Sequence, residues 1–598
     1  MEVIKKHYDV VVVGGGLAGV CAAISSARNG ARTALVHDRS MLGGNASSEV
    51  RMCICGADAH GTRANARETG IVEEFLLRNR SYNPEQSFSI SDTIFWEMTR
   101  FQENLDLYLN ARVTDVESVA GRIVSVTAYQ TTNEKKLIFT SGIFVDSTGD
   151  GFVAASAGAE YMTGREAKSK FNEPDAPDEH DDYVMGITLL FKSYNTGKPV
   201  KFVKPAWAYT YTEEDLKNRG HYAGAHIWKS KYGIDSGYWW IELGGGELDV
   251  IKDTEEIRDE LLKVLYGVWD HIKNGGDHGA ENYVLDWVQF FPAKRESRRI
   301  TGDYILTEND LLSSRKFDDA VAYGGWPMDM HAIKGIRNLQ SPPTTYIHVP
   351  DIYEIPYRCY YSRNIENLMM AGRCISVTHM AHGSTRVMGT CAVGGQAVGT
   401  AAALATRKKC SPREVGMYID ELQQQLLKDD CYIPNIKNTD PADKALKCRK
   451  ITASSFIEGS EPTNVVNGIH RSDKTGTNCW QSKSLGDGQH IMLDFEKSIE
   501  VSEVIIRFDS NLSKEISLFL FKSHLTDQIP GVPPEIAKDF DIEFISGSQV
   551  VKTISINENF MRMVRVPLDE KVACDSIRVT VKSTYGADFA KIFEIRVY

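Results

Sequence analysis

The sequence lacks a long hydrophobic run and a block of basic residues. Of its 598 residues, 42% are hydrophobic and 25% are charged, and the formal net charge is −12 with a pI near 5.8. No apolar run reaches the roughly 20 residues that a transmembrane helix needs. Proteins that bind nucleic acid usually show a basic patch or stripe in their sequence, and this chain shows no such block. We therefore expect a globular protein of about three or four domains that binds neither a membrane nor nucleic acid.

Paired cysteines and an N-terminal signal segment are also missing. The 11 cysteines are an odd number and form no C-x-x-C motif, which favours free thiols over a disulfide framework. Residues 1–10 contain two lysines but no apolar core of the kind that a secretory signal has. The expected location is therefore the cytoplasm. If a signal segment was removed before Met1, the expected location is the periplasm.

The cysteines also lack the spacing of a metal-binding motif, and no metal site is predicted. Cys53 and Cys55 are the only close pair, and their spacing would place both side chains on one face of a strand. Two interpretations stay open for this pair. They form a redox or metal-binding pair, or they are packed side chains that lie near a cofactor.

A glycine-rich turn lies close to the start of the chain. Residues 8–19 read YDVVVVGGGLAG, which predicts a buried parallel strand, a tight turn and a helix in that order. Gly14 permits the sharp turn, Gly16 lets a pyrophosphate approach the backbone, and Gly19 lets the helix pack on the sheet. Exposed amides at the start of the helix would hold the phosphates. The residues predicted to form this dinucleotide site are Gly14, Gly16, Leu17, Ala18 and Gly19; a glycine-rich turn without a ligand is the alternative.

A second strand is predicted over residues 32–37 (RTALVH), after a helix that stops at Gly30. A dinucleotide fold usually places a carboxylate at the end of this strand to accept the ribose hydroxyls. This chain has His37 and then Asp38, so either a neutral imidazole nitrogen or the Asp38 carboxylate is expected to make that contact. The loop that follows is expected to border the cofactor through Gly43, Gly44, Asn45 and Ser47.

Further along, strands are predicted over residues 105–109, 113–116, 123–130 and 137–145, which together form a β-meander ending in DSTGDG. At this point the chain resembles the flavoproteins with two dinucleotide-binding domains, in which an [AS]-T-G-D strand end closes on FAD. The segments LGGNASSEVRM, DSTGDG and GAEYMTGRE resemble more narrowly the bacterial FAD-dependent oxidoreductase family, which includes members labelled xanthan lyase-like. The resemblance implies FAD as the cofactor and contacts from Thr148, Gly149 and Asp150.

The same resemblance covers residues 367–405, which contain the motifs AGR and GQAVG. In the family, a strand that ends in AGR and the G-Q-A-x-G helix complete the FAD site, and the start of that helix faces the flavin pyrimidine. The helix is predicted over residues 394–404. The positions that the resemblance assigns to the cofactor are Gly372, Arg373, Gly395 and Gln396.

Four polar side chains lie between these two motifs: His379, His382, Ser384 and Arg386. We expect them at the flavin, with His379 or His382 as the base, because neutral imidazole suits proton transfer near neutral pH. Arg386 would bind an anionic group of the substrate or a developing charge. His331, which would share one face of a strand with Asp329, is either a further base or a structural histidine.

The predicted fold class is α/β, with a Rossmann-like FAD-binding domain interrupted by an inserted α+β substrate domain and followed by an all-β sandwich. The FAD-binding domain is expected in two parts, residues 1–160 and 359–440, with the substrate or cap domain at 161–358. Residues 451–598 show short alternating strands, and their motifs resemble galactose-binding, discoidin-like modules. Trp480 in this region either stacks on a sugar or belongs to the core.

The chain contains one G-x-G-x-x-G motif, so a second nucleotide site for NAD(P)H is not predicted. The substrate itself would then reduce the flavin by transferring a hydride from a C–H bond to flavin N5. The resemblance favours a small molecule, first a sugar or glycoside, and leaves the electron acceptor unidentified. A polysaccharide lyase-like enzyme with a redox-assisted or structural FAD, and a non-catalytic carbohydrate-binding flavoprotein, are the alternatives. The sequence does not predict the oligomeric state.

Overall fold

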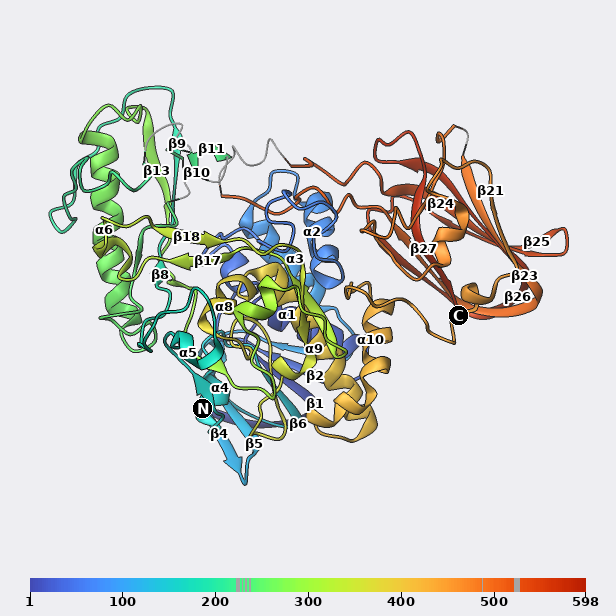
Figure 1. The fold of residues 1–598 in the computed structure, drawn as a ribbon, viewed down its shortest axis with the longest axis horizontal. Helices are drawn as coiled ribbons and strands as arrows, with labels where there is room; N and C mark the ends of the chain where they lie inside the picture. The colour runs from blue at the N-terminus through green and yellow to red at the C-terminus, as the bar shows by residue number, and fades with distance from the viewer. Residues whose placement is uncertain (222–225, 228–229, 232–233, 236–237, 487, 521–527) are drawn as a thin grey trace. The chain divides into compact units, whose positions relative to one another are not determined.

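The fold is described from a computed structural model of the chain. The structure describes residues 1–598 except 222–225, 228–229, 232–233, 236–237, 487 and 521–527 (Figure 1). The chain divides into two compact units, which are described separately. Unit 1 comprises residues 1–59, 86–422 and 517–528, and unit 2 comprises residues 60–85, 423–516 and 529–598. The domain boundaries expected from the sequence remain predictions, because this division is coarser than they are.

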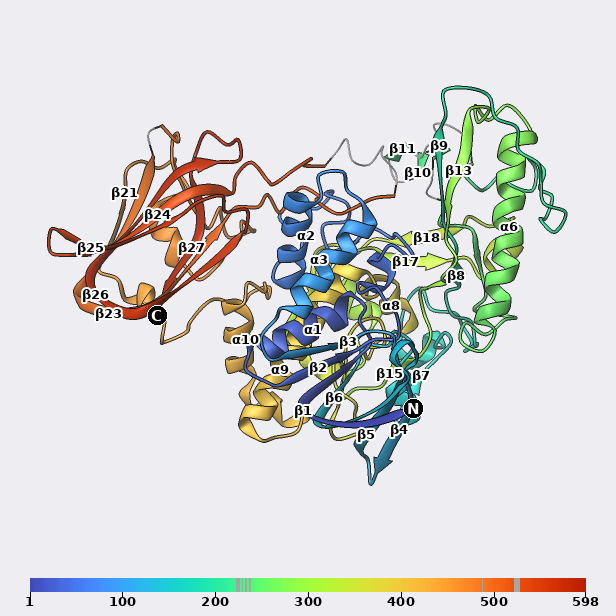
Figure 2. The same cartoon turned by 180° about the vertical axis from the view of Figure 1, so that it is seen from behind.

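Unit 1 is built on a seven-stranded sheet whose central strands are parallel. β1 (Glu2–Val13), β2 (Thr33–Val36) and β3 (Leu105–Tyr108) lie side by side in the order β3-β2-β1, as Figure 2 shows. β6 (Lys135–Asp146) pairs in parallel with the other edge of β1, and β20 (Leu368–Met370) pairs in parallel with the end of β6. Val10 to Val13 of β1 are buried, as expected for a parallel strand covered on both faces. The predicted mixed α/β content with a parallel-rich sheet is therefore confirmed.

An antiparallel edge extends this sheet. β5 (Arg122–Gln130) pairs with the first half of β6, and β4 (Ala111–Val119) pairs with β5. The prediction that residues 105–109 belong to the same meander is wrong, because β3 pairs in parallel with β2. The reason is α3 (Phe88–Arg100), which precedes β3 and supplies the crossover that parallel pairing requires. The sequence predicts this helix over residues 91–104 with Ser91 or Asp92 as its cap, which is wrong: the helix starts at Phe88, and the Asp92 carboxylate accepts the amide of Ser48 at 3.0 Å.

Two helices made of small residues pack against each other in unit 1. α1 (Leu17–Arg28) follows β1, and α9 (Met388–Lys408) follows β20 after a short helix, α8 (His379–Thr385). A Cβ atom at Gly399 would lie 2.0 Å from the carbonyl oxygen of Ala22 in α1, so the backbones touch where that residue has no side chain. No other residue type would fit there without moving the helices apart.

The region between β6 and β20 carries a long amphipathic helix, α6 (Thr254–Asn274). Its apolar face contributes Ile257, Leu261 and Val268 to a buried cluster, as the spacing predicted. The sequence also predicts a capping box of Asp253 and Glu256 at the start of this helix. That prediction is wrong, because the Asp253 side chain accepts the amide of Asp249 at 2.8 Å and makes no cap bond within the helix.

The other elements of unit 1 are short, and they pair in small antiparallel sheets. The strands are β7 (Tyr161–Met162), β8 (Ile187–Thr188), β9 (Phe191–Asn195), β10 (His226–Ile227), β11 (Ser230–Lys231), β12 (Glu242–Leu243), β13 (Tyr283–Val288), β14 (Ala293–Lys294), β15 (Arg299–Ile300), β16 (Ala320–Gly324), β17 (Met328–His331), β18 (Thr344–Ile347) and β19 (Tyr353–Pro356). The helices are α4 (Phe152–Ser156), α5 (Lys168–Phe171) and α7 (Glu308–Leu312). The chain passes from unit 1 to unit 2 within α10 (Ile419–Lys428).

Unit 2 is built on an antiparallel sheet of seven strands in the order β22-β27-β23-β26-β24-β25, with β21 paired to β23. The strands are β21 (Lys450–Ala453), β22 (Trp480–Gln481), β23 (Gln489–Phe508), β24 (Ala537–Ser546), β25 (Gln549–Ile556), β26 (Met563–Thr584) and β27 (Lys591–Val597). β23 and β26 are long, and the register of their pairing shifts between Asp494 and Ile499. Such irregularities bend strands. The predicted C-terminal antiparallel all-β region is confirmed at this level.

Trp480 lies inside the core of unit 2. Its side chain is fully buried among the aliphatic residues of β23, β26 and β27, and its indole nitrogen donates to the carbonyl oxygen of Ser455 at 2.9 Å. The interpretation that Trp480 stacks on a sugar is therefore wrong, and the core interpretation is correct.

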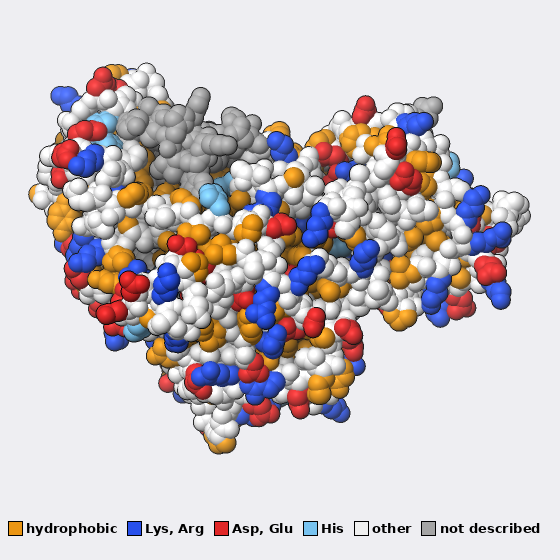
Figure 3. Space-filling view, in the orientation of Figure 1, with side chains coloured by type: hydrophobic (Ala, Val, Ile, Leu, Met, Phe, Trp, Pro, Cys, Tyr) orange, Lys and Arg blue, Asp and Glu red, His pale blue; other side chains and the backbone are white. Residues whose placement is uncertain are grey.

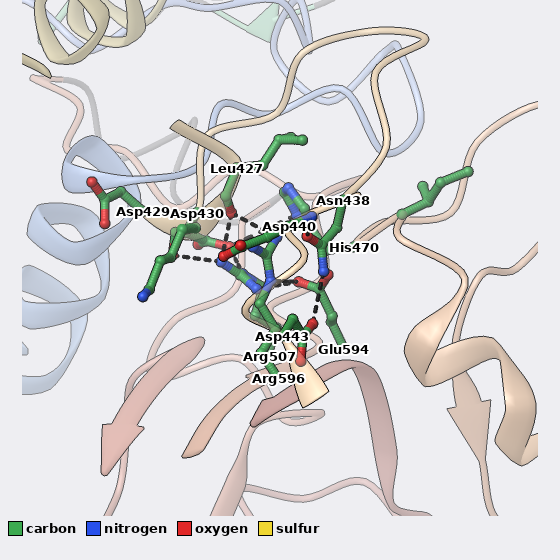
Figure 4. A network of polar contacts seen from close by, with 12 residues as sticks. Leu427, Asp429, Asp430, Asn438, Asp440, Asp443, His470, Arg507, Glu594 and Arg596 are labelled. Carbon is green, nitrogen blue, oxygen red and sulfur yellow. Dashed lines mark hydrogen bonds and ion pairs between the residues drawn. The ribbon is translucent and has the colours of Figure 1, made fainter. Parts of the chain in front are cut away.

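A buried polar network lies beside this core and is drawn in Figure 4. Arg507 of β23 donates to the Asp430 carboxylate at 2.8 Å, to the Leu427 carbonyl at 2.7 Å and to the Glu594 carboxylate. Arg596 of β27 also reaches the Leu427 carbonyl, at 3.1 Å. The network thus ties the last turn of α10 and Asp430, which follows it, to two strands of the sheet within unit 2. α2 (Ile71–Tyr82) also belongs to this unit.

The surface charge is mixed on the face shown in Figure 3, where acidic and basic side chains of the described residues are interspersed. Within the described part of the chain, no single helix is long and apolar enough to cross a membrane. α8 and α9 together meet that criterion of length and composition, but their axes are bent by 92° and most of the pair is buried inside unit 1.

Candidate functional site

The turn between β1 and α1 has the close contacts that the glycine motif predicts. Gly14 has a φ of +104°, and a Cβ atom there would lie 2.2 Å from the carbonyl oxygen of Ser147. A Cβ atom at Gly19 would lie 1.9 Å from the carbonyl oxygen of Gly14. A Cβ atom at Gly16 would meet nothing within 4 Å. Gly14 and Gly19 are therefore required by the fold, whereas Gly16 borders open space.

The start of α1 is equipped to bind an anion. Gly16 is the N-cap residue, no side chain caps the helix, and its first turn contains no acidic residue. The described residues provide no acceptor for the amides of Leu17 and Ala18. Free amides at the positive end of a helix fit a phosphate. With the open space at Gly16, they fit the pyrophosphate of a dinucleotide such as FAD.

The second glycine loop lies directly beside the first. The amide of Gly43 donates to the carbonyl oxygen of Gly15 at 2.8 Å, and both Gly43 and Gly44 have positive φ values, of +99° and +59°. Ser47 supports this loop by donating to the Gly44 carbonyl at 2.7 Å, and Asn45 reaches the Lys294 carbonyl at 3.4 Å. The structure therefore brings these four predicted residues to the turn, with Ser47 and Asn45 acting on the protein itself.

His37 supports the same turn from the end of β2. Its Nδ1 accepts the amide of Gly15 at 2.9 Å, and its Nε2 donates to the Met41 carbonyl at 3.0 Å. Burial lowers the pKa of His37, which suits this neutral tautomer. Because both ring nitrogens are engaged, the predicted ribose contact through His37 does not fit this structure. The Asp38 carboxylate, which is about half exposed, is the remaining candidate.

The turn after β6 is held by its own side chains. The buried Asp146 carboxylate accepts the amide and hydroxyl of Thr148 and the amide of Ala154, at 2.7–3.0 Å. Burial raises the pKa of Asp146. Gly149 has a φ of +81°, and a Cβ atom there would lie 2.7 Å from the guanidinium of Arg373. Thr148 and Gly149 thus shape the turn that was predicted to close on the cofactor.

Arg373 and Asp150 face each other across this turn. The Arg373 guanidinium contacts the Asp150 carboxylate at 3.2 Å, and Lys294 contacts the same carboxylate at 2.7 Å. Burial raises the pKa of Asp150, but Arg373 and Lys294 outweigh it and hold the pKa below its usual value. Gly372 has a φ of +95°, and a Cβ atom there would lie 3.4 Å from Ala18. The structure therefore brings the AGR motif to the start of α1, as predicted.

Gly395 and Gln396 lie elsewhere than expected. α9 begins at Met388 rather than at residue 394, so these two residues lie about two turns inside the helix. A Cβ atom at Gly395 would lie 2.2 Å from the carbonyl oxygen of Ala18, and the Gln396 carbonyl accepts the Ser25 hydroxyl at 3.0 Å. Their placement at the start of the cofactor helix is wrong, and they serve the contact between α1 and α9.

α8 presents the first candidate base, His379. Thr378 caps the helix by accepting the amide of Ala381, and it places His379 next to the buried Glu296. His379 Nδ1 lies 3.0 Å from one Glu296 oxygen and 2.9 Å from the other. No described residue bonds to Nε2. Since the carboxylate accepts at Nδ1, the neutral ring carries its free lone pair on Nε2.

Glu296 is held as a carboxylate by its surroundings. Burial raises its pKa, but His379 and Arg299 outweigh burial and lower the pKa to about 2. Arg299 contacts Glu296 at 3.3 Å and Glu166 at 3.1 Å, and Glu166 accepts the backbone amide of His379 at 2.9 Å. Glu296 thus orients the His379 side chain and Glu166 holds its backbone amide, and the two carboxylates share Arg299.

His382 is a weaker candidate for the base. Its Nε2 donates to the Arg295 carbonyl at 3.2 Å, and its Nδ1 is buried with no hydrogen-bond partner. Burial lowers the pKa of His382 to about 3. The ring is therefore neutral, and its remaining lone pair is closed off from solvent.

His331 and Arg386 share one carboxylate, that of Asp329. His331 Nε2 lies 3.2 Å from Asp329 and its Nδ1 lies 2.6 Å from Glu242, so both ring nitrogens are engaged. Arg386 donates to Asp329 at 2.8 Å. Burial raises the pKa of Asp329, but His331 and Arg386 outweigh it and hold the pKa well below its usual range. The structural interpretation of His331 fits this geometry better than the interpretation as a base.

The residues 295–299 connect these two groups. Arg295 is buried and contacts Glu242 at 3.4 Å, and Arg299 is buried against Glu166 and Glu296. From the sequence alone this run was either a clamp for an anion or a solvated charge run; Arg295 and Arg299 are instead held in internal ion pairs. All four predicted catalytic residues are therefore brought into one neighbourhood by β14, α8 and β17.

Two smaller predictions also meet the structure here. The sequence predicts that one of Trp239 and Trp240 faces the core and leaves the other either in the core or lining a pocket, and it leaves two interpretations of Cys53 and Cys55 open. Trp240 is buried and donates to the Gly220 carbonyl at 3.2 Å, while Trp239 is partly exposed and lies edge-on to His331 with ring centroids 5.5 Å apart. The sulfur atoms of Cys53 and Cys55 lie 3.6 Å apart and are not joined in a disulfide. The Cys55 carbonyl accepts the amide of Gly389 near the start of α9, which fits the interpretation that the pair packs near the cofactor region.

Several residues of the site were missed by sequence reasoning. Glu296, Glu242 and Glu166 orient the candidate side chains from segments far away in the chain. A second group, formed by Glu213, His221, His271 and His278, was missed as well. Its members lie in three segments with no metal-binding spacing, so only their closeness in space identifies them.

Comparisons with known proteins give one strong match. Residues 9–426 match the family model described as FAD dependent oxidoreductase, which covers well over half of the chain. No curated protein matches the sequence.

Solved structures resemble a part of the chain. A fucose-binding module of Streptococcus pneumoniae is 16% identical and covers 26% of this chain and 97% of its own, with a TM-score of 0.20. A family 32 carbohydrate-binding module of C. perfringens in complex with galactose is 17% identical and covers 25% and 91%, with a TM-score of 0.18. A chitosan-binding module of Paenibacillus sp. is 16% identical and covers 26% and 98%, with a TM-score of 0.20.

Proposed function

The chain belongs to the FAD dependent oxidoreductase family, and from this premise we propose that it oxidises a small organic molecule at a C–H bond with the help of His379. FAD is the cofactor that the family implies. The chemistry that bound FAD would supply is hydride acceptance from the substrate, and the protein would supply binding, orientation and electrostatics. A sugar or a glycoside is the first substrate class to test, because the motifs of residues 451–598 resemble galactose-binding modules.

The residues that would hold FAD are those whose free groups fit it. The amides of Leu17 and Ala18 would bind the pyrophosphate beside Gly16, and Asp38 would accept the ribose hydroxyls. The turn at Gly149 and the Arg373 side chain would border the rest of the molecule. The assignment at Gly16 rests on open space and on the amides of Leu17 and Ala18, and the assignment of Asp38 rests on an exposed carboxylate.

One observation carries the assignment of the base. The Glu296–His379 pair holds an imidazole whose Nδ1 is fixed by a carboxylate and whose Nε2 bonds to no described residue. This is the arrangement that a general base requires: an oriented ring with an available lone pair. His379 would take the proton of the substrate O–H or N–H as the neighbouring C–H bond is oxidised. Arg386, held by Asp329, would contribute positive charge near the reacting group.

The proposal is tested by mixing the yellow protein anaerobically with candidate sugars and glycosides. Bleaching of the flavin absorbance, with formation of the oxidised sugar, supports the proposal. An unsaturated sugar product without net flavin reduction would contradict it in favour of a lyase. Binding of a sugar with neither change would contradict it in favour of a non-catalytic protein.

The variant Gly16→Val tests whether the cofactor binds where we propose. Its side chain would enter the open space at Gly16, whose φ of −63° any residue can adopt. We expect a protein that purifies colourless and does not take up FAD, with an apo free energy of unfolding within about 0.5 kcal/mol of the wild type. Gly142→Ala is the matched control, because a Cβ atom there lies 3.6 Å from its nearest neighbour, an ordinary contact. A yellow Gly16→Val protein would contradict the placement.

A further inference from the structure

Three histidines and a glutamate converge in unit 1 outside the site described above. His271 lies in the last turn of α6, His278 lies in the loop after it, and Glu213 and His221 come from a segment about 60 residues earlier. The three imidazoles are buried, and their ring centroids are 4.8–5.1 Å apart. The Glu213 side chain is 64% exposed. The group therefore has a buried wall of rings and one carboxylate that reaches the surface.

The Nε2 atoms of the three rings face a single carboxylate oxygen. The Glu213 Oε2 atom lies 3.1 Å from His271, 3.1 Å from His278 and 3.4 Å from His221. One possible ligand atom from each of the four residues lies within 4.8 Å of the other three. Bonds of 2.0–2.1 Å to a tetrahedral ion place neighbouring ligand atoms roughly 3.3 Å apart. The observed separations from Glu213 match that edge length.

The orientation of His221 shows what the group is built to bind. Its Nδ1 lies 2.5 Å from the Arg219 carbonyl oxygen, which can only accept, so the ring donates its proton there. With the proton on Nδ1, the Nε2 lone pair points toward the Glu213 oxygen, which is also an acceptor. Two acceptors that face each other need a cation between them. A backbone carbonyl that fixes the far nitrogen is the usual support of a metal-binding histidine.

The other two histidines present the same ring nitrogen, Nε2, to this oxygen, each at 3.1 Å. Nδ1 of His271 and Nδ1 of His278 are buried and have no hydrogen-bond partner among the described residues. Each ring therefore has only its Nε2 side engaged, and that side points at the same oxygen atom. The Nε2 atoms of the three buried rings thus converge on one carboxylate oxygen, which is the arrangement of side chains that a metal ion with imidazole and carboxylate ligands requires.

We propose that Glu213, His221, His271 and His278 bind a zinc ion. Three imidazole nitrogens and one carboxylate oxygen form a donor set that suits zinc, whose usual geometry in proteins is tetrahedral. All four positions are filled by the protein, which is the property of a structural site rather than a catalytic one. The ion joins the end of α6 to a segment that carries little regular structure, and it is separate from the proposed redox chemistry. It also departs from the sequence prediction that the chain has no metal site.

The test begins with the full chain, purified without a polyhistidine tag. Its zinc content, measured by mass spectrometry, is expected to be about one ion per chain, as for a single four-ligand site. After removal of zinc by a chelator, Co²⁺ is added as a spectroscopic probe. We expect the intense visible absorption that tetrahedral Co²⁺ shows. A zinc-free protein that also gives no tetrahedral Co²⁺ spectrum would overturn the proposal.

The variants His271→Gln and His278→Gln remove one ligand each and keep the side chain polar. We expect each to weaken zinc binding by more than the roughly 10–100-fold that loss of an outer-shell hydrogen-bond partner causes. His348→Gln is the matched control, because His348 is exposed and lies outside the group. Unchanged zinc affinity in both ligand variants would overturn the proposal.

The variant Glu213→Gln keeps the test decisive if the buried variants fail to fold. Its side chain is mostly exposed, so its removal of charge should leave the fold intact. We expect zinc affinity to fall at least about 10-fold and the Co²⁺ spectrum to change, because a carboxylate ligand is replaced by a neutral amide. The same affinity and the same spectrum as in the wild type would contradict a site that includes Glu213.

Discussion

The polar network around Glu296 in unit 1 can be compared with the network around Asp430 in unit 2. Both bury a carboxylate against arginine: Glu296 lies 3.3 Å from Arg299, and Asp430 lies 2.8 Å from Arg507. Both also contain a histidine. In unit 1, His379 keeps one ring nitrogen without a described partner, whereas in unit 2 both ring nitrogens of His470 are engaged.

The surroundings of His470 disfavour its protonated, charged form, although the Asp430 carboxylate lies 3.8 Å from Nδ1. Its Nε2 donates to the Cys431 carbonyl at 3.0 Å, and its Nδ1 faces the Arg562 guanidinium at 3.4 Å. Burial lowers the pKa of His470 well below its usual value, and Arg507 and Arg562 lower it further. Such a ring cannot act as a base, and the network serves to fasten chain segments to the sheet of unit 2.

The difference between the partners of His379 and His470 indicates where a buried network can hold a reactive imidazole. A nearby arginine disfavours the protonated form of an imidazole. A carboxylate partner orients the ring and favours its protonated form. Glu296 provides the second kind of partner, and its own charge is kept by Arg299. A buried carboxylate paired with arginine can therefore orient an available imidazole, as in unit 1, or fasten chain segments, as in unit 2.

The largest effect is expected from replacing the free imidazole. His379→Asn removes the proposed base while an amide can still donate to Glu296. We expect anaerobic reduction of the flavin, by the sugar that bleaches the wild type, to slow by about 10²–10⁴-fold, because this is the usual contribution of a general base. Stopped-flow absorbance measures the rate, and the absorbance of the purified protein shows that FAD is still bound.

His470→Asn is the matched control in unit 2, where the ring has no free nitrogen. Its reduction rate is expected to equal that of the wild type. If His379→Asn reduced its flavin as fast as the wild type does, the contrast between the two histidines would have no functional meaning, and His379 would not be the base.

The second-largest effect is expected from removing the charge of the buried carboxylate in each network, Asp430 or Glu296. Asp430→Asn and Glu296→Gln each leave a buried arginine without one of its charged partners, and such losses destabilise a protein by about 3–5 kcal/mol. We expect urea unfolding, followed by circular dichroism, to shift to lower denaturant in both variants. In addition, Glu296→Gln should lower the rate of flavin reduction, whereas Asp430→Asn should leave it unchanged.

Equal losses of reduction rate in these two variants would break the comparison, because it would mean that the rate follows stability alone. Asp319→Asn provides a surface control, since its ion pair with Arg358 is partly exposed at 2.9 Å. Exposed pairs contribute only about 0–1 kcal/mol.

Local sequence patterns were sufficient for the parts of unit 1 that depend on neighbouring residues. Gly14 and Gly19 could be assigned because the turn itself demands them, and β1 and α1 followed from the order of apolar residues and glycines. The strand before the AGR motif was predicted for the same reason, and it is β20. The alternation of residues 451–598 likewise predicted an antiparallel region.

Contacts between distant segments could not be predicted in this way. Glu296 and His379 are 83 residues apart, and nothing in either segment identifies the other as its partner. Gly395 was misplaced because α9 continues six residues further toward its start than its small-residue motif suggests. The group of Glu213, His221, His271 and His278 was missed because each segment of the chain holds only one or two of its members.

The smallest expected effect is a difference in how two buried acids, Glu308 in unit 1 and Asp443 in unit 2, make stability depend on pH. Burial raises the pKa of Glu308 in α7 to about 8, and one of its oxygens has no hydrogen-bond partner. Burial also raises the pKa of Asp443 in unit 2, but this carboxylate accepts the amides of Val597 and Ala445 at 3.0 Å, which limits the rise. Of these two acids, Glu308 should therefore contribute more to the dependence of the unfolding free energy on pH above neutrality.

Because the pKa of Glu308 is higher in the folded than in the unfolded chain, its contribution is complete below about pH 4.5 and is lost as the pH rises through about 8. Glu308→Gln keeps the neutral form at every pH. We expect the wild type to lose about 2–4 kcal/mol more unfolding free energy than this variant between pH 5 and 9, at about 1.4 kcal/mol for each unit of pKa shift. Urea unfolding at several pH values measures the difference, with the exposed Glu281→Gln as the control. Parallel pH profiles for the wild type and Glu308→Gln would contradict this prediction. They would show that Glu308 is already ionised in the folded protein and that its pKa is not raised more than that of Asp443.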